Sequence, residues 1–166
     1  SMARWSGRFV VVLCLCGLIT FCSEPPKQEE AVPEGMQPPP LGSWIMYGSD
    51  SRMLTEDRLN EEETVLVLSD SSYSLTFKRP SIKFMFVESG KVYYDLRAKI
   101  ARFTVASTSG FDFSSGVPRK LALIPESVPF QRDPGTLYGL NYSTRDSLLS
   151  LSGEGMATSW FIRMSN

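Results

Sequence analysis

The feature that most constrains the fold of this chain is a repeated alternation of apolar and polar residues. It occurs in SSYSLTFK (71–78), in KVYYDLR (91–97) and in TLYGLNYS (136–143). In each segment every second residue is a tyrosine, leucine, valine or phenylalanine, and most residues between them are polar or small. A period of two places one set of side chains on each face of a strand, so we expect three half-buried antiparallel strands. Helical spacing fits none of the three.

Less regular apolar runs lie between and around these segments. They span residues 43–47, 64–68, 82–87, 100–105, 119–124, 147–151 and 158–164. Turn-forming residues separate many of the runs, as in Ser69-Asp70-Ser71, Ser89-Gly90 and Asp133-Pro134-Gly135. The pattern therefore predicts an all-β domain of eight to ten strands joined mostly by tight turns.

A series of sequential hairpins leaves two exposed sheet edges, and closing the sheet into a barrel removes both. We therefore expect residues 41–166 to form a single antiparallel up-and-down barrel, with a two-sheet sandwich as the alternative. Two connections are longer than hairpin turns. They are 48–63, in which Thr55 is expected to cap a short helix, and 107–117. Long loops at the mouth of a barrel are where binding contacts usually lie.

The first 21 residues have the organisation of a secretion signal. Arg4 and Arg8 form a basic start, and residues 9–21, FVVVLCLCGLITF, are almost entirely apolar. This run is shorter than the roughly 20 residues that a membrane-spanning helix needs, so we expect a cleaved signal peptide. Ser1, in front of Met2, is expected to be a cloning remnant.

The apolar run is followed at once by Cys22, in the sequence LITFC, and strongly polar residues come next. With Ile19 three residues before the cysteine and Thr20 two before it, this segment resembles the signal of a bacterial lipoprotein. The resemblance implies acylation of Cys22 and a lipid anchor in the bacterial cell envelope, at the outer membrane on its periplasmic face or at the cell surface. Phe21 stands where that signal has a small residue, so cleavage elsewhere without acylation is the alternative.

The segment 22–40 is rich in proline and glutamate. Such a stretch buries too little apolar surface to fold alone, and proline stiffens it toward an extended polyproline II conformation. We expect a semi-rigid tether that holds the barrel up to about 55 Å from the lipid, at about 3.1 Å per residue. A docking ligand for a proline-recognising domain is the alternative.

The barrel segment resembles the lipocalin-like small barrels of bacterial lipoproteins. The likeness is carried by Gly42-Ser43-Trp44, a G-x-W on the first expected strand, by the long loop after it, and by Arg163 on the last strand. In lipocalins the tryptophan of this motif fills the closed end of the barrel and a late arginine packs across its ring. The resemblance therefore implies that Trp44 and Arg163 form a barrel-closing pair with a cation-π contact.

The residue types present exclude several chemistries. No histidine occurs, and no cysteine follows Cys22, which removes Ser-His-Asp catalysis, thiol catalysis and the commonest zinc ligands. Glu61-Glu62-Glu63 lacks the glycine turn of a calcium loop, so we interpret it as a solvated acidic run. No nucleophile-elbow motif occurs. We therefore expect a non-enzymatic protein with no metal and no other cofactor.

Binding is the function that the sequence favours. An eight-stranded barrel is just wide enough to be filled by side chains or to hold one small ligand. We expect a small hydrophobic or lipid-like ligand to contact six inward-facing aromatic residues. They are Tyr73, Phe77, Tyr94, Phe103, Tyr138 and Tyr142. An internal cavity of a few hundred Å³ would favour this hypothesis, and a filled interior would favour protein binding instead.

The second hypothesis is a protein-binding module of the envelope. SGKVYY, residues 89–94, is similar to the S-G-x-x-Y loop of periplasmic lysozyme inhibitors, and this resemblance implies that the loop enters the lysozyme cleft. As a sequence signal, Ser89-Gly90 is also explained by a hairpin turn. An accessory subunit of a larger envelope assembly is another form of this hypothesis. The formal charge of -1 offers no excess positive field for nucleic acid, and we expect a monomer.

Overall fold

A computed structural model describes residues 33–49, 52–53, 62–126, 128 and 131–165, without the side chains of 52–53. The expected signal peptide, Cys22 and the helix at Thr55 lie outside the described residues. No helix within the described ranges is long and apolar enough to cross a membrane.

The described chain is built almost entirely of β-strands. They are β1 (Gly42–Ser49), β2 (Arg52–Met53), β3 (Glu63–Leu68), β4 (Ser72–Arg79), β5 (Phe84–Asp95), β6 (Ile100–Asp112), β7 (Arg119–Lys120), β8 (Leu137–Arg145), β9 (Leu148–Ser152) and β10 (Ser159–Arg163). A single turn of 3-10 helix, Pro80–Ile82, joins β4 to β5.

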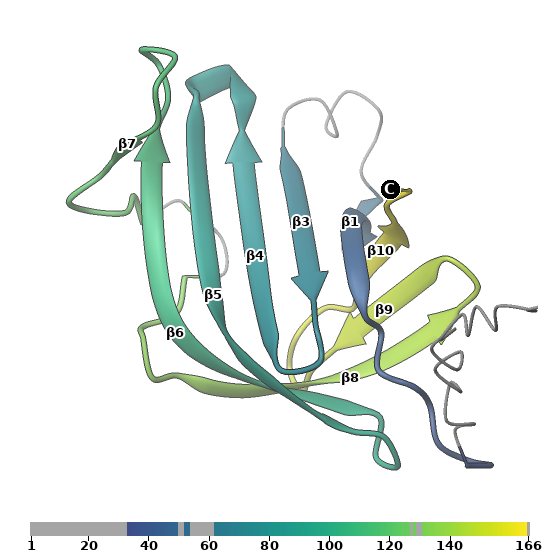
Figure 1. The fold of residues 1–166 in the computed structure, drawn as a ribbon. Coiled ribbons are helices and arrows are strands. Elements are labelled where there is room, and N and C mark those ends of the chain that lie inside the picture. Colours follow the sequence, from purple (N-terminus) through teal and green to yellow (C-terminus); the bar gives the residue numbers. More distant parts are fainter. Residues whose placement is uncertain (1–32, 50–51, 54–61, 127, 129–130, 166) are drawn as a thin grey trace, which may run out of the picture. The chain divides into compact units, whose positions relative to one another are not determined.

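Eight of these strands close an antiparallel barrel (Figure 1). From β1 through β3, β4, β5, β6, β8 and β9 to β10, each strand pairs with the next, and β10 pairs back onto β1. At this closing seam Trp44 lies opposite Arg163. The short strands β2 and β7 pair with β1 and β6. The prediction of a single antiparallel up-and-down barrel is confirmed.

The period-two pattern explains which side chains fill the interior. On β4 the side chains of Tyr73, Leu75 and Phe77 are buried, while the polar residues between them are more exposed. Inward residues from all eight strands form two core clusters. The larger one contains Trp44, Phe103, Tyr142 and Leu149, and the smaller one contains Phe77, Phe84, Phe86 and Val128. Most of the interior is therefore packed hydrocarbon.

β5 differs from the expectation at Ser89-Gly90. The sequence suggested a hairpin turn there, but both residues lie within β5, at a β-bulge where the register against β6 shifts. A Cβ on Gly90 would stand 1.9 Å from the carbonyl oxygen of Thr104, so only glycine allows β6 to approach this closely. The expectation of a turn was wrong because glycine here relieves a close backbone contact and does not end the strand.

The region after β6 also differs from the expectation. β6 continues to Asp112, so the first half of the expected 107–117 loop is strand. Of the strand expected over 119–124, only Arg119–Lys120 pairs with β6. The connection from β6 to β8 is therefore long, and it brings Val128 into the smaller core cluster. Sequence alternation did not reveal this because burial of that connection depends on the surrounding barrel.

The last residues of the expected tether pack against the barrel. The Gln37 backbone N–H donates to the Leu96 carbonyl oxygen at 3.2 Å, and its side-chain amide donates to the Thr144 carbonyl oxygen at 3.0 Å. The Tyr142 hydroxyl donates to the Gln37 carbonyl oxygen at 2.9 Å. The chain thus joins the barrel at Gln37, at the end that carries the β5–β6 and β8–β9 turns.

Candidate binding sites

Trp44 is fully buried beside the start of β1, and its environment is built from the preceding residues and from β10. Its indole N–H donates to the Pro40 carbonyl oxygen at 2.9 Å. The Arg163 guanidinium lies 4.3 Å from the centre of the Trp44 ring and donates to the Leu41 carbonyl oxygen at 2.8 Å. The structure therefore brings the two residues of the expected barrel-closing pair into contact.

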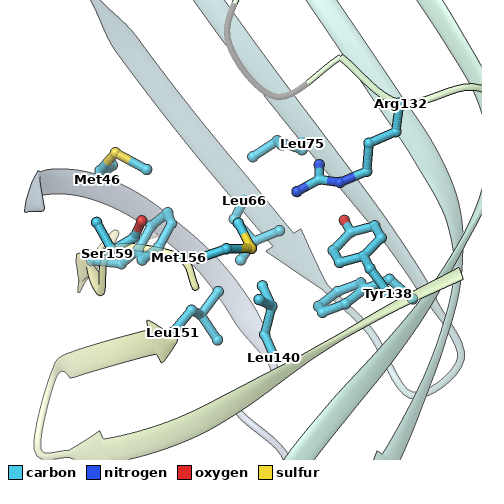
Figure 2. A pocket seen from close by; sticks show the side chains of 12 residues that line it. Met46, Leu66, Leu75, Arg132, Tyr138, Leu140, Leu151, Met156 and Ser159 are labelled. Carbon is cyan, nitrogen blue, oxygen red and sulfur yellow. The ribbon is translucent and has the colours of Figure 1, made fainter. Parts of the chain in front are cut away.

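A small pocket lies inside the barrel, between the side chains of β1, β3 and β4 and those of β8, β9 and β10 (Figure 2). Figure 2 shows Arg132 and Tyr138 on one side of the pocket and Met46 and Leu151 on the other, with Met156 between them. The pocket has a volume of about 50 Å³. Typical ligand sites have about 300–1,000 Å³, and a cavity that holds benzene has about 150 Å³. Among the described residues, the interior is thus nearly filled.

A buried carboxylate lies beside this pocket. Glu88 is fully buried, and its Oε1 accepts hydrogen bonds from the hydroxyls of Tyr73 at 2.8 Å and Tyr138 at 2.9 Å. Its Oε2 lies 3.4 Å from Nη1 of Arg132, whose side chain is only 16% exposed. A buried charge is tolerated when it is paired and hydrogen-bonded, and this cluster of four residues meets both conditions.

Phe103 contacts both aromatic rings of this cluster. The Arg132 guanidinium lies 3.9 Å from the centre of the Tyr138 ring, and Phe103 stacks on that ring at 4.9 Å. Tyr73 meets Phe103 edge-on at 4.8 Å. Burial raises the pKa of Tyr73 and of Tyr138 well above the ordinary phenol value, and the Glu88 carboxylate adds to this effect. Both phenols therefore stay protonated and act as hydrogen-bond donors at neutral pH.

The six aromatic residues expected to line a ligand site lie in different parts of the barrel. Phe103 and Tyr138 line the interior pocket. Tyr94 and Tyr142 meet edge-on at 6.3 Å, and the Tyr94 hydroxyl donates to the Ser69 carbonyl oxygen. Tyr73 belongs to the Glu88 cluster and Phe77 to the smaller core cluster. The structure therefore does not gather the six around one cavity.

A larger hollow lies on the outer face of the barrel, over β5, β6 and β8. It is open to solvent and has a volume of about 600 Å³. Cross-strand pairing arranges its outward-facing residues in two rows. They are Lys91, Thr104 and Leu137 in one row, and Tyr93, Arg102 and Gly139 in the other. We call this surface the outer hollow.

The outer hollow combines exposed apolar side chains with cations. Tyr93 is 65% exposed and Leu137 is 75% exposed, although both stand on regular strands. Lys91 and Arg102 supply two positive charges, and the hollow has no acidic lining residue in the part of the chain that the structure describes. Large exposed apolar side chains grouped in a hollow are typical of protein-binding surfaces.

The segment similar to the lysozyme-inhibitor loop contributes to the outer hollow as part of a strand and not as a loop. Residues 89–94 all lie within β5, and of these Lys91 and Tyr93 face the outer hollow. The expected projecting loop is absent at this place, because the strand continues through Ser89-Gly90 to Asp95.

The sequence did not single out Glu88 or Arg132. Glu88 follows Phe84 and Phe86 at a spacing of two, so the alternation in FMFVE was the available signal that it faces inward. Arg132 lies on the long connection before β8, where no periodicity marks a buried position. The outer hollow was also missed, because it requires the pairing of β5, β6 and β8.

Two residues of the acidic run, at the end of the first long connection, form ordinary surface ion pairs. Glu62 lies 3.2 Å from Arg79, and Glu63 lies 3.5 Å from Lys78 on the neighbouring strand. Within the described ranges, no group of three or more acidic, histidine or cysteine side chains is placed to hold a metal ion.

In comparisons with protein-family models, curated proteins and solved structures, nothing matches this chain. The function therefore has to be argued from the sites themselves, since a barrel fold alone supports many functions.

Proposed function

We propose that this chain is a lipid-anchored protein of the bacterial envelope that binds another protein through the outer face of its barrel. In this proposal Cys22 carries the lipid, as the lipoprotein-like signal implies, and residues 23–36 form the tether up to Gln37, where the chain meets the barrel. The barrel serves as the scaffold for this binding surface. As the lipocalin-like resemblance of Gly42-Ser43-Trp44 implies, Trp44 and Arg163 have a structural role in it.

The observation that carries the proposal is the contrast between the interior and the outer face. The interior pocket has about 50 Å³, whereas the outer hollow has about 600 Å³ and groups the exposed side chains of Tyr93 and Leu137. An interface core needs such exposed aromatic and aliphatic anchors beside polar groups. A nearly filled barrel that exposes them is better suited to a protein partner than to a small ligand.

Site-specific photo-crosslinking tests this proposal. A photoreactive phenylalanine analogue replaces Tyr93 in the full chain, expressed in its own host, and replaces Ile82 in the control. Ile82 is also well exposed but lies in the 3-10 turn between β4 and β5, outside the outer hollow. We expect a discrete protein adduct from position 93 and none from position 82. Equal labelling at both positions, or adducts with lipid alone, would contradict the proposal.

The lipid anchor needs a separate test because it is independent of the outer face. A clickable palmitate analogue is expected to label the full wild-type chain but not the Cys22→Ala variant. In cell fractionation, the variant should no longer be found with the membranes. Labelling that persists in Cys22→Ala would show that a residue other than Cys22 is acylated.

A small hydrophobic ligand is the second candidate function. The specific observation for it is the composition of the interior pocket, whose walls are apolar apart from Arg132, Tyr138 and Ser159. Met46 and Met156 also line it, and methionine side chains rearrange more easily than branched ones. Native mass spectrometry of the chain purified from its host tests this candidate. A bound molecule of a few hundred daltons, lost in a variant that fills the pocket such as Ala157→Trp, would favour it over protein binding.

A further inference from the structure

We infer that the outer hollow receives a segment of the partner protein that carries a carboxylate next to an aliphatic or aromatic side chain. This inference rests on the proposed function and names the chemistry of its partner. The carboxylate is placed between Lys91 and Arg102, and the apolar side chain is placed over Gly139, beside Leu137.

The positive charges of the outer hollow are the reason to expect a carboxylate in the partner segment. Lys91 and Arg102 stand on paired strands, on diagonally related outward positions, so their side chains reach the same space. Neither forms an ion pair within the part of the chain that the structure describes, where the four ion pairs involve other cations. Two cations in a hollow with no acidic residue among its described lining attract an anionic group and repel a basic one.

Gly139 is the reason to expect an apolar side chain next to that carboxylate. A Cβ at this position would meet the nearest atom, Cγ2 of Ile100, at 3.5 Å, which is ordinary van der Waals contact. The backbone there does not have a positive φ, so neither close packing nor backbone strain requires glycine. The missing side chain instead leaves a gap on the outer face beside Arg102 and Leu137, and one apolar side chain of a partner fits such a gap.

The hollow is formed in advance by three hydrogen-bonded strands. Tyr93, Arg102 and Gly139 lie in one cross-strand row, and the backbone around them is fixed by pairing on both sides of β6. Binding of a partner therefore orders only the side chains of this surface, because its backbone is already fixed. This lowers the entropic cost of binding. Among the described residues two cations line the hollow, and the whole chain has a formal charge of -1, so a protein carboxylate suits the site better than a phosphate backbone or an anionic lipid surface.

The test uses the full chain with the photoreactive residue at position 93 and compares three variants. The double variant Lys91→Gln and Arg102→Gln removes both charges, Gly139→Leu fills the gap, and Lys120→Gln removes an exposed cation outside the hollow. We expect the yield of the protein adduct to fall at least about fivefold in the first two and to stay unchanged in the third. Mass spectrometry of the adduct is expected to map the partner peptide to a segment with an aspartate or glutamate adjacent to an apolar residue.

The outcomes separate this inference from the function on which it rests. A protein adduct that keeps its yield in the double variant, or that maps to a segment without carboxylates, would overturn the inferred chemistry and leave protein binding standing. No protein adduct from any variant would overturn the proposed function itself. Because Gly139→Leu is the variant most able to disturb the strands, its circular dichroism spectrum is compared with the wild type, and the charge variant decides the inference if that spectrum changes.

Discussion

The guanidinium carbon of Arg163 lies 4.3 Å from the centre of the Trp44 ring, and the two residues face each other across the β1–β10 seam that closes the barrel. The same guanidinium passes over Gly42, where a Cβ would stand 2.7 Å from its Nη1. Gly42 also has a φ of +119°, which L side chains rarely adopt. The glycine and the tryptophan of the G-x-W motif are therefore both explained by one arginine on the last strand.

Replacing Arg163 tests this relationship. Arg163→Met removes the contact with the Trp44 ring and the hydrogen bond to Leu41, so the free energy of unfolding is expected to fall by about 1–3 kcal/mol. Urea unfolding followed by tryptophan fluorescence measures the change. Arg145→Met, at an exposed position on β8, serves as the control and should change stability by less than about 0.5 kcal/mol. Equal losses in the two variants would contradict a special role for Arg163.

The Glu88 cluster leads to a second prediction. Glu88→Leu leaves Arg132 and two phenols without their acceptor inside the barrel, so we expect a loss of about 3–5 kcal/mol in the free energy of unfolding. Combining it with Arg132→Leu also removes the cation that faced Glu88, and the double variant is expected to recover at least about 1 kcal/mol of the summed losses.

The control for the Glu88 and Arg132 variants is the exposed ion pair of Glu63 and Lys78, whose side chains are about two-fifths exposed. Glu63→Gln should cost less than about 1 kcal/mol, because solvent screens this pair. Strict additivity of the Glu88 and Arg132 variants in chemical unfolding would show that the two side chains do not interact in the folded protein.

The fold was predictable from the sequence because alternation is a local property. Tyr73, Leu75 and Phe77 had to face one side of a strand in any antiparallel arrangement, and a series of such strands favours closure. Ser89-Gly90 could not be placed in the same way. The need for glycine there comes from the carbonyl of Thr104 on the next strand, which is a tertiary contact.

The sites were less predictable than the fold for the same reason. Glu88 shares the inward parity of Phe84 and Phe86, so its direction was readable, but its partner Arg132 is separated from it by 44 residues. The outer hollow depends on outward residues of three strands that carry no motif. Only the pairing of β5 with β6 and of β6 with β8 places them together.

The buried tyrosines predict the response of the barrel to alkaline pH. Burial raises the pKa of Tyr73, Tyr94, Tyr138 and Tyr142 in the folded state, whereas in the unfolded chain a phenol titrates near about 10. The unfolded state therefore loses these protons first as pH rises. The stabilisation is fully present below about pH 10 and is lost progressively above it.

Parallel measurements of phenolate absorbance and circular dichroism from pH 8 to 12 check this response. The phenolate signal of these four tyrosines is expected to appear together with loss of β structure. Tyr94→Phe, which removes one of these phenols, should make stability fall less steeply with pH. Complete ionisation of all tyrosines with the β signal intact would contradict the prediction.

Two glycines on β5 and β8, the strands on either side of β6, provide the sharpest test of the β5–β6 geometry. Gly90→Ala would place a Cβ 1.9 Å from the Thr104 carbonyl oxygen and 3.0 Å from the Ala106 nitrogen, both backbone atoms of β6. The strands can relieve this contact only by separating at the bulge, so we expect a loss of about 3–5 kcal/mol or failure to fold. Gly139→Ala adds the same methyl group at a place with ordinary contacts, and its stability should stay within about 0.5 kcal/mol of the wild type. Unfolding by urea, followed by circular dichroism, compares the two. Equal stability of the variants would mean that β5 and β6 do not approach each other this closely at the bulge.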